Sequence, residues 1–277
     1  MSATDTYTAF YGQLASYAPL SMLSLFLLTI FRLAPIIAVS PFLGSKLPAN
    51  IKMGLCVALA FIMLPHVVMT SKTAIVFNLT YITLLAKEFM MGIILAVFSS
   101  VPFYMAQGSG VLIDFARGSS SLQVNDPFTQ TQASDLGILY NYIMIVIFYE
   151  VNGFTYFFDA VMGSFDIIPA DGWINPAFFS FRHPFWDTVW HLMTKIFAVS
   201  IQLAAPSLLA ILMTELFLGI ANRLAPQVQI AFLGMSLKSL AGLAMLAVAW
   251  VFIVKQLGVQ LNLWLKEIPR VIQTMNY

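Results

Sequence analysis

The chain has 277 residues and a formal net charge of +1 at pH 7; 60% of its residues are hydrophobic and only 9% are charged. An average soluble protein carries about 25% charged residues, so this chain has too few charges to cover a soluble surface. The composition therefore excludes a soluble globular protein and predicts an integral membrane or membrane-embedded one. The low net charge, with no basic cluster, gives no basis for nucleic-acid binding.

Six apolar blocks follow one another along the chain, at about 19–43, 52–70, 74–105, 136–165, 188–220 and 228–254. Crossing a bilayer takes about 20 helical residues, and Pro35, Pro41 and Pro206 inside the blocks predict kinks. We therefore expect an all-α, membrane-associated bundle of about six long, kinked hydrophobic helices arranged as helical hairpins. We expect one domain, 1–277: four helices in 1–165, then a second polar loop, the last two helices and a tail in 166–277.

The distribution of charged residues does not predict which side of the membrane each helix end faces. Basic residues are divided about equally between the two sides if each block crosses once, whereas the positive-inside rule needs a clear excess. The missing bias suggests helices that are held by partner proteins as much as by lipid. No basic region precedes the first apolar block, so a cleavable signal peptide is not expected.

The longest polar interruption of the apolar pattern runs from Gly108 to Gly137. It is longer than the roughly 2–8 residues that usually join two helices, and it is too polar for lipid. It nevertheless keeps apolar side chains such as Phe115, Leu122 and Phe128, which a disordered linker normally lacks. We therefore expect a structured loop that packs against another surface, and we expect it to be the functional centre.

Charged residues within or beside the apolar blocks are costly in lipid and mark either a function or a buried partner. The expected inter-helix or inter-subunit charges are Arg32, Lys46, Lys87, Glu88, Glu150, Glu215, Arg223 and Lys238. Asp159 and Lys195 share this setting. Because the charges are spread over several blocks with no close carboxylate pair, we favour pairing in an assembly over a proton or ion pathway. Lys87 and Glu88 are sequence neighbours and point about 100° apart, so each is expected to find a separate partner.

The segment around Arg223 has the pattern of a tight turn between two helices. Arg223 would lie in the last turn of one helix, where a cation suits the helix dipole, and Pro226 suits the first turn of the next. A local cap and a subunit contact are equally supported. Arg-Leu-Ala-Pro occurs at 32–35 and again at 223–226. An internal repeat of the kind found in transporters is one explanation. Chance similarity is the favoured explanation, because apolar segments use few residue types.

His183, Asp187 and His191 recur every four residues and would share one helical face, which can hold a metal. An interfacial aromatic belt with Trp186 and Trp190 explains the pattern better. We therefore expect no metal and no cofactor. The sequence has no phosphate loop, nucleophile elbow or HExxH motif, so an enzyme is not expected.

Three stretches carry a resemblance to a known family. The first is FRLAPIIAVSPFLGSKLPANIKMGL, from Phe31 to Leu55; the second is ELFLGIANRLAPQVQIAFLGMSLKSLAGL, from Glu215 to Leu243. The third, in the central polar stretch, is ARGSSSLQVNDPFTQTQASDLG, from Ala116. Together they resemble the FliR/SctT export-gate proteins of flagellar and type III secretion systems over nearly the whole chain. The third stretch is more similar to the injectisome branch, SctT, than to the flagellar branch, FliR.

This resemblance implies a core component of the export apparatus, embedded in the bacterial inner membrane within the basal body. Such proteins join smaller partners of the SctR/FliP and SctS/FliQ types and a switch protein of the SctU/FlhB type. The first four helices would resemble one small partner and the last two the other. The assembly would form the pore that secretes unfolded proteins, and the loop between the third and fourth blocks would plug it. The plug residues carried over are Gly108, Gly110, Asp114, Phe115, Arg117, Gly118, Ser119, Ser120, Asp126 and Pro127.

Two alternatives stay open. The central loop can merely cover the mouth of a helix bundle, or the chain can be a small-molecule secondary transporter that uses the intramembrane charges. A transporter is expected to be stable and active alone, with saturable uptake. An export-gate component is expected to be labile without its partners.

Overall fold

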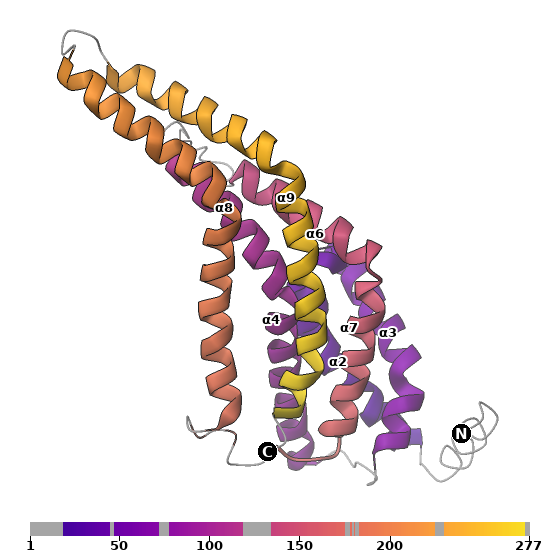
Figure 1. Ribbon diagram of the computed structural model, residues 1–277. Coiled ribbons are helices and arrows are strands. Elements are labelled where there is room, and N and C mark those ends of the chain that lie inside the picture. Colours follow the sequence, from indigo (N-terminus) through magenta and orange to yellow (C-terminus); the bar gives the residue numbers. More distant parts are fainter. Residues whose placement is uncertain are drawn as a thin grey trace. The chain divides into compact units, whose positions relative to one another are not determined.

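The computed structural model describes residues 19–44, 47–71, 78–118, 134–174, 178, 180, 183–224 and 230–274, and side chains of the last range from 234 onward. Its elements are α2 (Pro19–Val39), the short 3-10 helix η1 (Pro41–Leu43), α3 (Ala49–Thr70), α4 (Leu79–Ala116), α6 (Asp135–Glu150), α7 (Gly153–Ile167), α8 (Pro184–Leu224) and α9 (Ile230–Thr274). The described residues contain helices and no strand, which confirms the predicted all-α class (Figure 1).

Five of these helices, α2, α3, α4, α8 and α9, are long and apolar enough to cross a membrane, and α6 with α7 makes a sixth, broken candidate span. With 21 and 22 residues, α2 and α3 match the roughly 20 residues that a hydrocarbon core requires. With 38 and 41 residues, α4 and α8 are longer than one crossing needs. The predicted set of about six long hydrophobic helices is therefore present.

The third helix continues past its predicted end near Met105 and stops only at Ala116. Gly108, Gly110, Asp114 and Phe115 are therefore helical, and the predicted loop boundary was wrong. An internal glycine costs a helix roughly 1 kcal/mol relative to alanine. Here α4 tolerates two glycines because neighbouring helices lie against them, too close for a side chain.

The fourth block is not one helix, because it is interrupted at Val151 and Asn152, between α6 and α7. Asn152 has φ 56° and ψ 33°, a left-handed conformation that asparagine tolerates better than most residues. Gly153 follows at the first position of α7. The interruption bends the span between α6 and α7.

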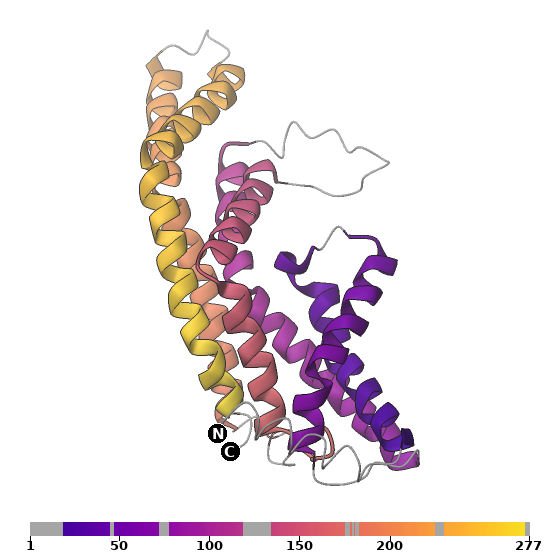
Figure 2. The same cartoon turned by 90° about the vertical axis from the view of Figure 1, so that its right-hand side faces the viewer.

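The described chain divides into two compact units, and the long helices contribute to both. The first unit contains residues 1–100, 152–189 and 265–277. In it α2 and α3 form an antiparallel hairpin (Figure 2), as Lys52 Nζ donating to the Ala38 carbonyl and Cys56 Sγ donating to the Ile30 carbonyl indicate. Fully buried apolar side chains of this hairpin, including Leu25, Leu28, Met63 and Val67, form part of its core.

The second unit contains residues 101–151 and 190–264. Its most extended feature is the antiparallel hairpin of α8 and α9, drawn in orange and yellow in Figure 1. Gly242 of α9 lies against the side chain of Ile211 of α8, which would have to shift to admit a larger residue. Against this hairpin α6 places the ring of Tyr140, 6.3 Å from the ring of Trp250. Aromatic and small residues thus set the close packing of this unit.

Candidate functional site

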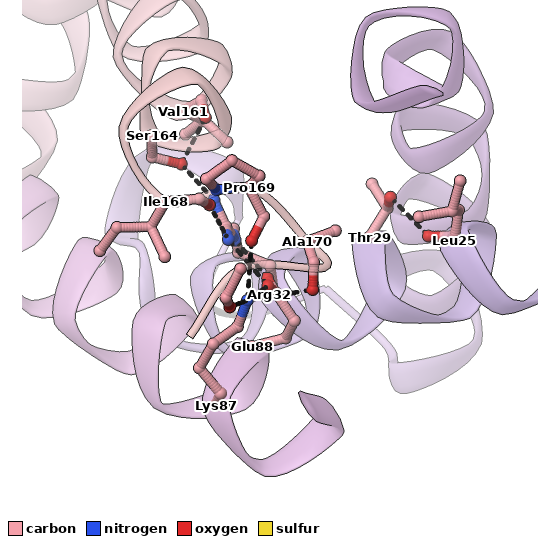
Figure 3. Close-up of polar contacts among 11 residues, drawn as sticks. Leu25, Thr29, Arg32, Lys87, Glu88, Val161, Ser164, Ile168, Pro169 and Ala170 are labelled. Atoms are coloured by element: carbon pink, nitrogen blue, oxygen red, sulfur yellow. Dashed lines mark hydrogen bonds and ion pairs between the residues drawn. The ribbon is translucent and has the colours of Figure 1, made fainter. Parts of the chain in front are cut away.

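A group of charged residues, here called the buried charge cluster, lies in the core of the first unit (Figure 3). Arg32 of α2 and Glu88 of α4 have no exposed surface and form a two-bond pair, Nε to Oε2 and Nη2 to Oε1, the latter at 2.8 Å. The guanidinium also donates to Ser164 Oγ and to the Ile168 carbonyl, each at 2.9 Å. It lies 3.7 Å from the ring centre of Phe165. Each guanidinium nitrogen therefore has a hydrogen-bond partner.

Lys87 is the second cation of the buried charge cluster. Its Nζ lies 2.6 Å from Glu88 Oε1, so the prediction that these neighbours find separate partners was wrong. The four-carbon stem of lysine lets its ammonium group reach an adjacent carboxylate that backbone geometry alone would place on another face. Nζ also donates to the carbonyls of Pro169 at 2.9 Å, Ala170 at 3.1 Å and Gly172 at 2.9 Å.

The cluster stabilises the chain that follows α7. After Ile167 the backbone is no longer helical, and buried carbonyl groups without partners would be costly in an apolar environment. Arg32 and Lys87 bind four of these carbonyls, those of residues 168, 169, 170 and 172. Gly92, one turn beyond Glu88, lets α4 approach the α2 backbone closely, because a Cβ there would overlap the Arg32 carbonyl. The cluster thus fixes α2, α4 and the end of α7 together.

A second polar group, here called the loop clamp, lies in the second unit where α4 ends and α6 begins. Asp114, which is 4% exposed, accepts bonds at Oδ1 from Arg117 Nε at 2.8 Å and Nη2 at 2.7 Å. Its Oδ2 accepts from Ser134 Oγ at 2.6 Å and from the Leu136 backbone N–H at 3.0 Å. One carboxylate therefore binds residues on both sides of the segment 119–133.

Backbone packing reinforces the loop clamp. Ser134 is the N-cap of α6, and its Oγ accepts from the Gly137 N–H at 2.9 Å. A Cβ at Gly110 would overlap the backbone of Leu136 and Gly137, so α4 and α6 are in direct contact there. The segment 119–133 therefore begins and ends at one narrow base.

The remaining predicted plug residues surround this base or lie beyond the described chain. Gly118 ends α4 with φ 81°, the left-handed conformation that favours glycine, and its N–H donates to the Phe115 carbonyl. Phe115 is 74% exposed, Arg117 Nη1 lies 3.5 Å from Ser239 Oγ of α9, and Gly108 packs against Ser200. Ser119, Ser120, Asp126 and Pro127 lie outside the described residues, as does Lys46.

The other charged residues that were predicted to pair lie outside the buried charge cluster and the loop clamp. Lys238 of α9 donates to Glu215 of α8 at 2.6 Å, so these two pair across the hairpin. Arg223 is exposed in the last turn of α8, and Glu150 is exposed at the end of α6. The ammonium group of Lys195 lies 5.8 Å from the ring centre of Trp264.

The histidine-containing segment forms an aromatic cluster at the start of α8. The ring centre of Phe178 lies 5.0 Å from that of Phe185 and 6.1 Å from that of Trp186. His183 is buried, and its Nδ1 accepts from the Phe185 N–H at 3.3 Å. The described part of the chain holds no group of three histidine, cysteine or acidic side chains suited to a metal ion.

Sequence reasoning missed Ser134 and Ser164. Ser134 had a usable signal, since a serine followed by an aspartate before an apolar run is typical of a helix start. Ser164 had none, because its partner Arg32 lies 132 residues away in sequence.

Comparison with known proteins places the chain in a family. The profile described as "Bacterial export proteins, family 1" matches residues 23–263. This chain belongs to that family. The surface presentation of antigens protein SpaR of Shigella flexneri is 27% identical over 213 residues, which are 76% of this chain and 78% of SpaR. The Yop proteins translocation protein T of Yersinia pestis is 27% identical over 161 residues, 58% of this chain and 60% of that protein. The flagellar biosynthetic protein FliR of Escherichia coli is 24% identical over 240 residues, 85% of this chain and 87% of FliR.

These matches confirm the predicted FliR/SctT resemblance, and the two injectisome relatives are more similar in identity than the flagellar one. The family and the apolar helices together identify a multi-pass inner-membrane protein with a role in the type III export apparatus. The related proteins are components of such apparatus rather than known enzymes.

Proposed function

We propose that this chain is a core subunit of the pore through which the export apparatus passes unfolded proteins. In this proposal, the segment between α4 and α6 closes the pore at rest. The loop clamp is the observation that carries it, because Asp114 binds both Arg117 at the end of α4 and Ser134 at the start of α6. A closure needs a fixed base from which only its tip is displaced.

The chemistry of the segment suits this role. A plug in a wet pore needs polar groups that water can replace when substrate arrives, and apolar side chains that fill a narrow lumen. Residues 119–133 combine serines, threonines, glutamines and Asp126 with Leu122 and Phe128. Gly118 adds a conformation that other residues rarely adopt. A loop that merely covers a bundle would not need a charged clamp at its base.

The partners in this proposal are subunits of the SctR/FliP, SctS/FliQ and SctU/FlhB types, together with unfolded protein substrates and membrane lipids. Large apolar side chains stay exposed along the α8–α9 hairpin, among them Leu216, Phe217, Val248, Val251 and Phe252. Large apolar side chains exposed in this number need lipid or another helix against them. Expressed alone, the chain is expected to be labile, and with its small partners it is expected to co-purify in detergent. A monodisperse, stable monomer would contradict this.

The pairing of five of the predicted charges argues against the transporter alternative. Arg32, Lys87 and Glu88 bind each other and backbone carbonyls, and Glu215 binds Lys238. A transporter needs groups that are free to bind and release an ion or substrate. Saturable uptake of a small molecule by the purified chain alone would revive this alternative.

The test of the closure removes residues 119–124 and leaves every residue of the loop clamp in place. The helices are untouched, so the complex is expected to assemble, and cells are expected to take up small dyes and grow more slowly. An assembled complex that stays impermeable to small solutes would contradict the proposal. Repeating the measurement with the partners' own constriction loosened removes the masking effect of a second barrier.

A further inference from the structure

A groove lies on the first unit between α7 and the end of α9, whose last turns run beside each other (Figure 2). Its volume is about 220 Å³. Its lining is mostly apolar, and the residues that matter here are Tyr156, Asp159 and Gly163 of α7 with Leu265, Pro269 and Gln273 of α9. None of these residues belongs to the buried charge cluster or to the loop clamp.

The α7 side of the groove is shaped for the close approach of another helix. A Cβ added at Gly163 would meet no atom within 4 Å, so the backbone itself is the surface there. Ala160, one turn earlier, is also small and lines the same groove. Small residues at a helix interface let two helix backbones come close together in membranes.

Asp159 supplies the charge of the groove. It is exposed on α7 and makes no hydrogen bond or ion pair with any residue that the structure describes. The α6–α7 pair is a candidate membrane span, and an unpaired carboxylate in such a span is costly. Tyr156 and Gln273, the other polar residues of the lining, cannot neutralise it. Charge complementarity therefore requires a cation.

We propose that this groove receives an apolar helix of another export subunit and that a lysine or arginine on that helix pairs with Asp159. This inference rests on the proposed function, since it concerns an assembly. A lipid chain would fill the apolar part and leave the carboxylate unpaired. The three residues that follow the described end of α9, Met275, Asn276 and Tyr277, include no basic side chain.

The test places a photoreactive p-benzoylphenylalanine at position 156 of the full chain, co-expressed with the other export subunits. Tyr156 lines the groove, is 57% exposed and is already aromatic, so the probe leaves the small residues of the groove unchanged. The expected product is a cross-link to one apolar helix, with a lysine or arginine within one turn of the attachment point. Tyr149 of α6 is the matched control position, because it is also an exposed tyrosine and does not line the groove. Its cross-links are expected to map to a different peptide.

Charge reversal then tests the pairing. Asp159→Lys is expected to lower the cross-link yield at position 156 on the order of tenfold, since it sets two cations against each other. Exchanging the partner's basic residue for glutamate is expected to restore the yield. A yield that does not respond to either change would overturn the pairing.

Three further outcomes test the groove inference and the proposed function separately. Cross-links only to lipid, to this same chain or to a second copy of it would overturn the inference. If the complex assembles and position 156 reaches no partner, the groove inference fails while the proposed function stands. If the chain enters no complex with the export subunits, the proposed function fails and the groove inference fails with it.

Discussion

The buried charge cluster and the loop clamp each use one carboxylate to hold several groups, but they differ in range. Glu88 has no exposed surface, and the cluster joins residues separated by 56 and 132 positions in sequence. Asp114 binds partners 3, 20 and 22 positions away, and the side chain of Arg117 is 14% exposed. The cluster can therefore open only when its unit comes apart, whereas the clamp can open while the helices stay packed.

The largest expected effect comes from Glu88→Gln. The change removes the buried carboxylate that Arg32 and Lys87 share, and breaking a buried ion pair costs about 3–5 kcal/mol. We expect the variant not to accumulate in membranes, as measured by its steady-state level. Glu267→Gln is the matched control, because its pair with Arg270 is exposed and such pairs contribute about 0–1 kcal/mol. Normal accumulation of Glu88→Gln would show that the cluster does not stabilise the first unit.

Lys87→Met is expected to cost less than Glu88→Gln. The Arg32–Glu88 pair stays intact and neutral, but the carbonyls of residues 169, 170 and 172 lose their donor. Of these three bonds only the one to Ala170 is buried, and the other two are part-buried. One unsatisfied buried group costs about 1–3 kcal/mol. We expect the thermal unfolding midpoint of the detergent-solubilised complex to fall measurably, with assembly preserved. A loss as severe as that of Glu88→Gln would mean that Lys87 matters as a charge and not as a donor.

Asp114→Ala tests the local nature of the clamp. The substitution removes the ion pair with Arg117 and the hydrogen bond from Ser134 to the end of α4. We expect trypsin to cleave after Arg117 several-fold faster in the assembled complex, with little change in the amount of complex. Ser134→Ala is expected to have a smaller effect, because Asp114 still holds Arg117 and the Leu136 N–H. Disassembly of the complex by Asp114→Ala would show that the clamp is part of the fold and not a local device.

Arg223→Ala is expected to have the smallest effect on stability. Arg223 is exposed in the last turn of α8, where a cation contributes about 0.3–1 kcal/mol through the helix dipole. We expect insertion into the membrane to be normal and the yield of co-purified partners to fall. Normal yield and normal secretion would show that Arg223 acts only as a cap of α8 and not in a subunit contact.

The sequence predicted most of the fold, because long apolar blocks specify membrane helices whatever their partners. It did not predict the interruption at Asn152, although Asn-Gly is a strong turn signal, since the apolar block of 136–165 masked it. It also did not predict the length of α4. Glycine propensity favours a helix end near 108, and the packing of Gly110 against α6 outweighs that preference.

The candidate sites could be predicted only in part, because packing between segments that are distant in sequence does not show in local patterns. Asp114 and Arg117 were identified through the family resemblance, and their three-residue spacing on a helix allows pairing. The buried charge cluster depends on contacts between distant segments and on backbone carbonyls, which no local pattern specifies. Lys87 and Glu88 show the limit of local rules, because the flexible lysine side chain overrides the direction of its backbone.

The conductance of the purified export complex in a planar bilayer tests the central claim, that the clamped segment closes a pore, most directly. We predict that the complex with the intact chain is closed at rest and that the complex lacking residues 119–124 conducts ions. The Glu267→Gln complex is expected to stay closed as a control. Equal closure of the intact and shortened complexes, with assembly verified for both, would contradict the role of this segment as the closure.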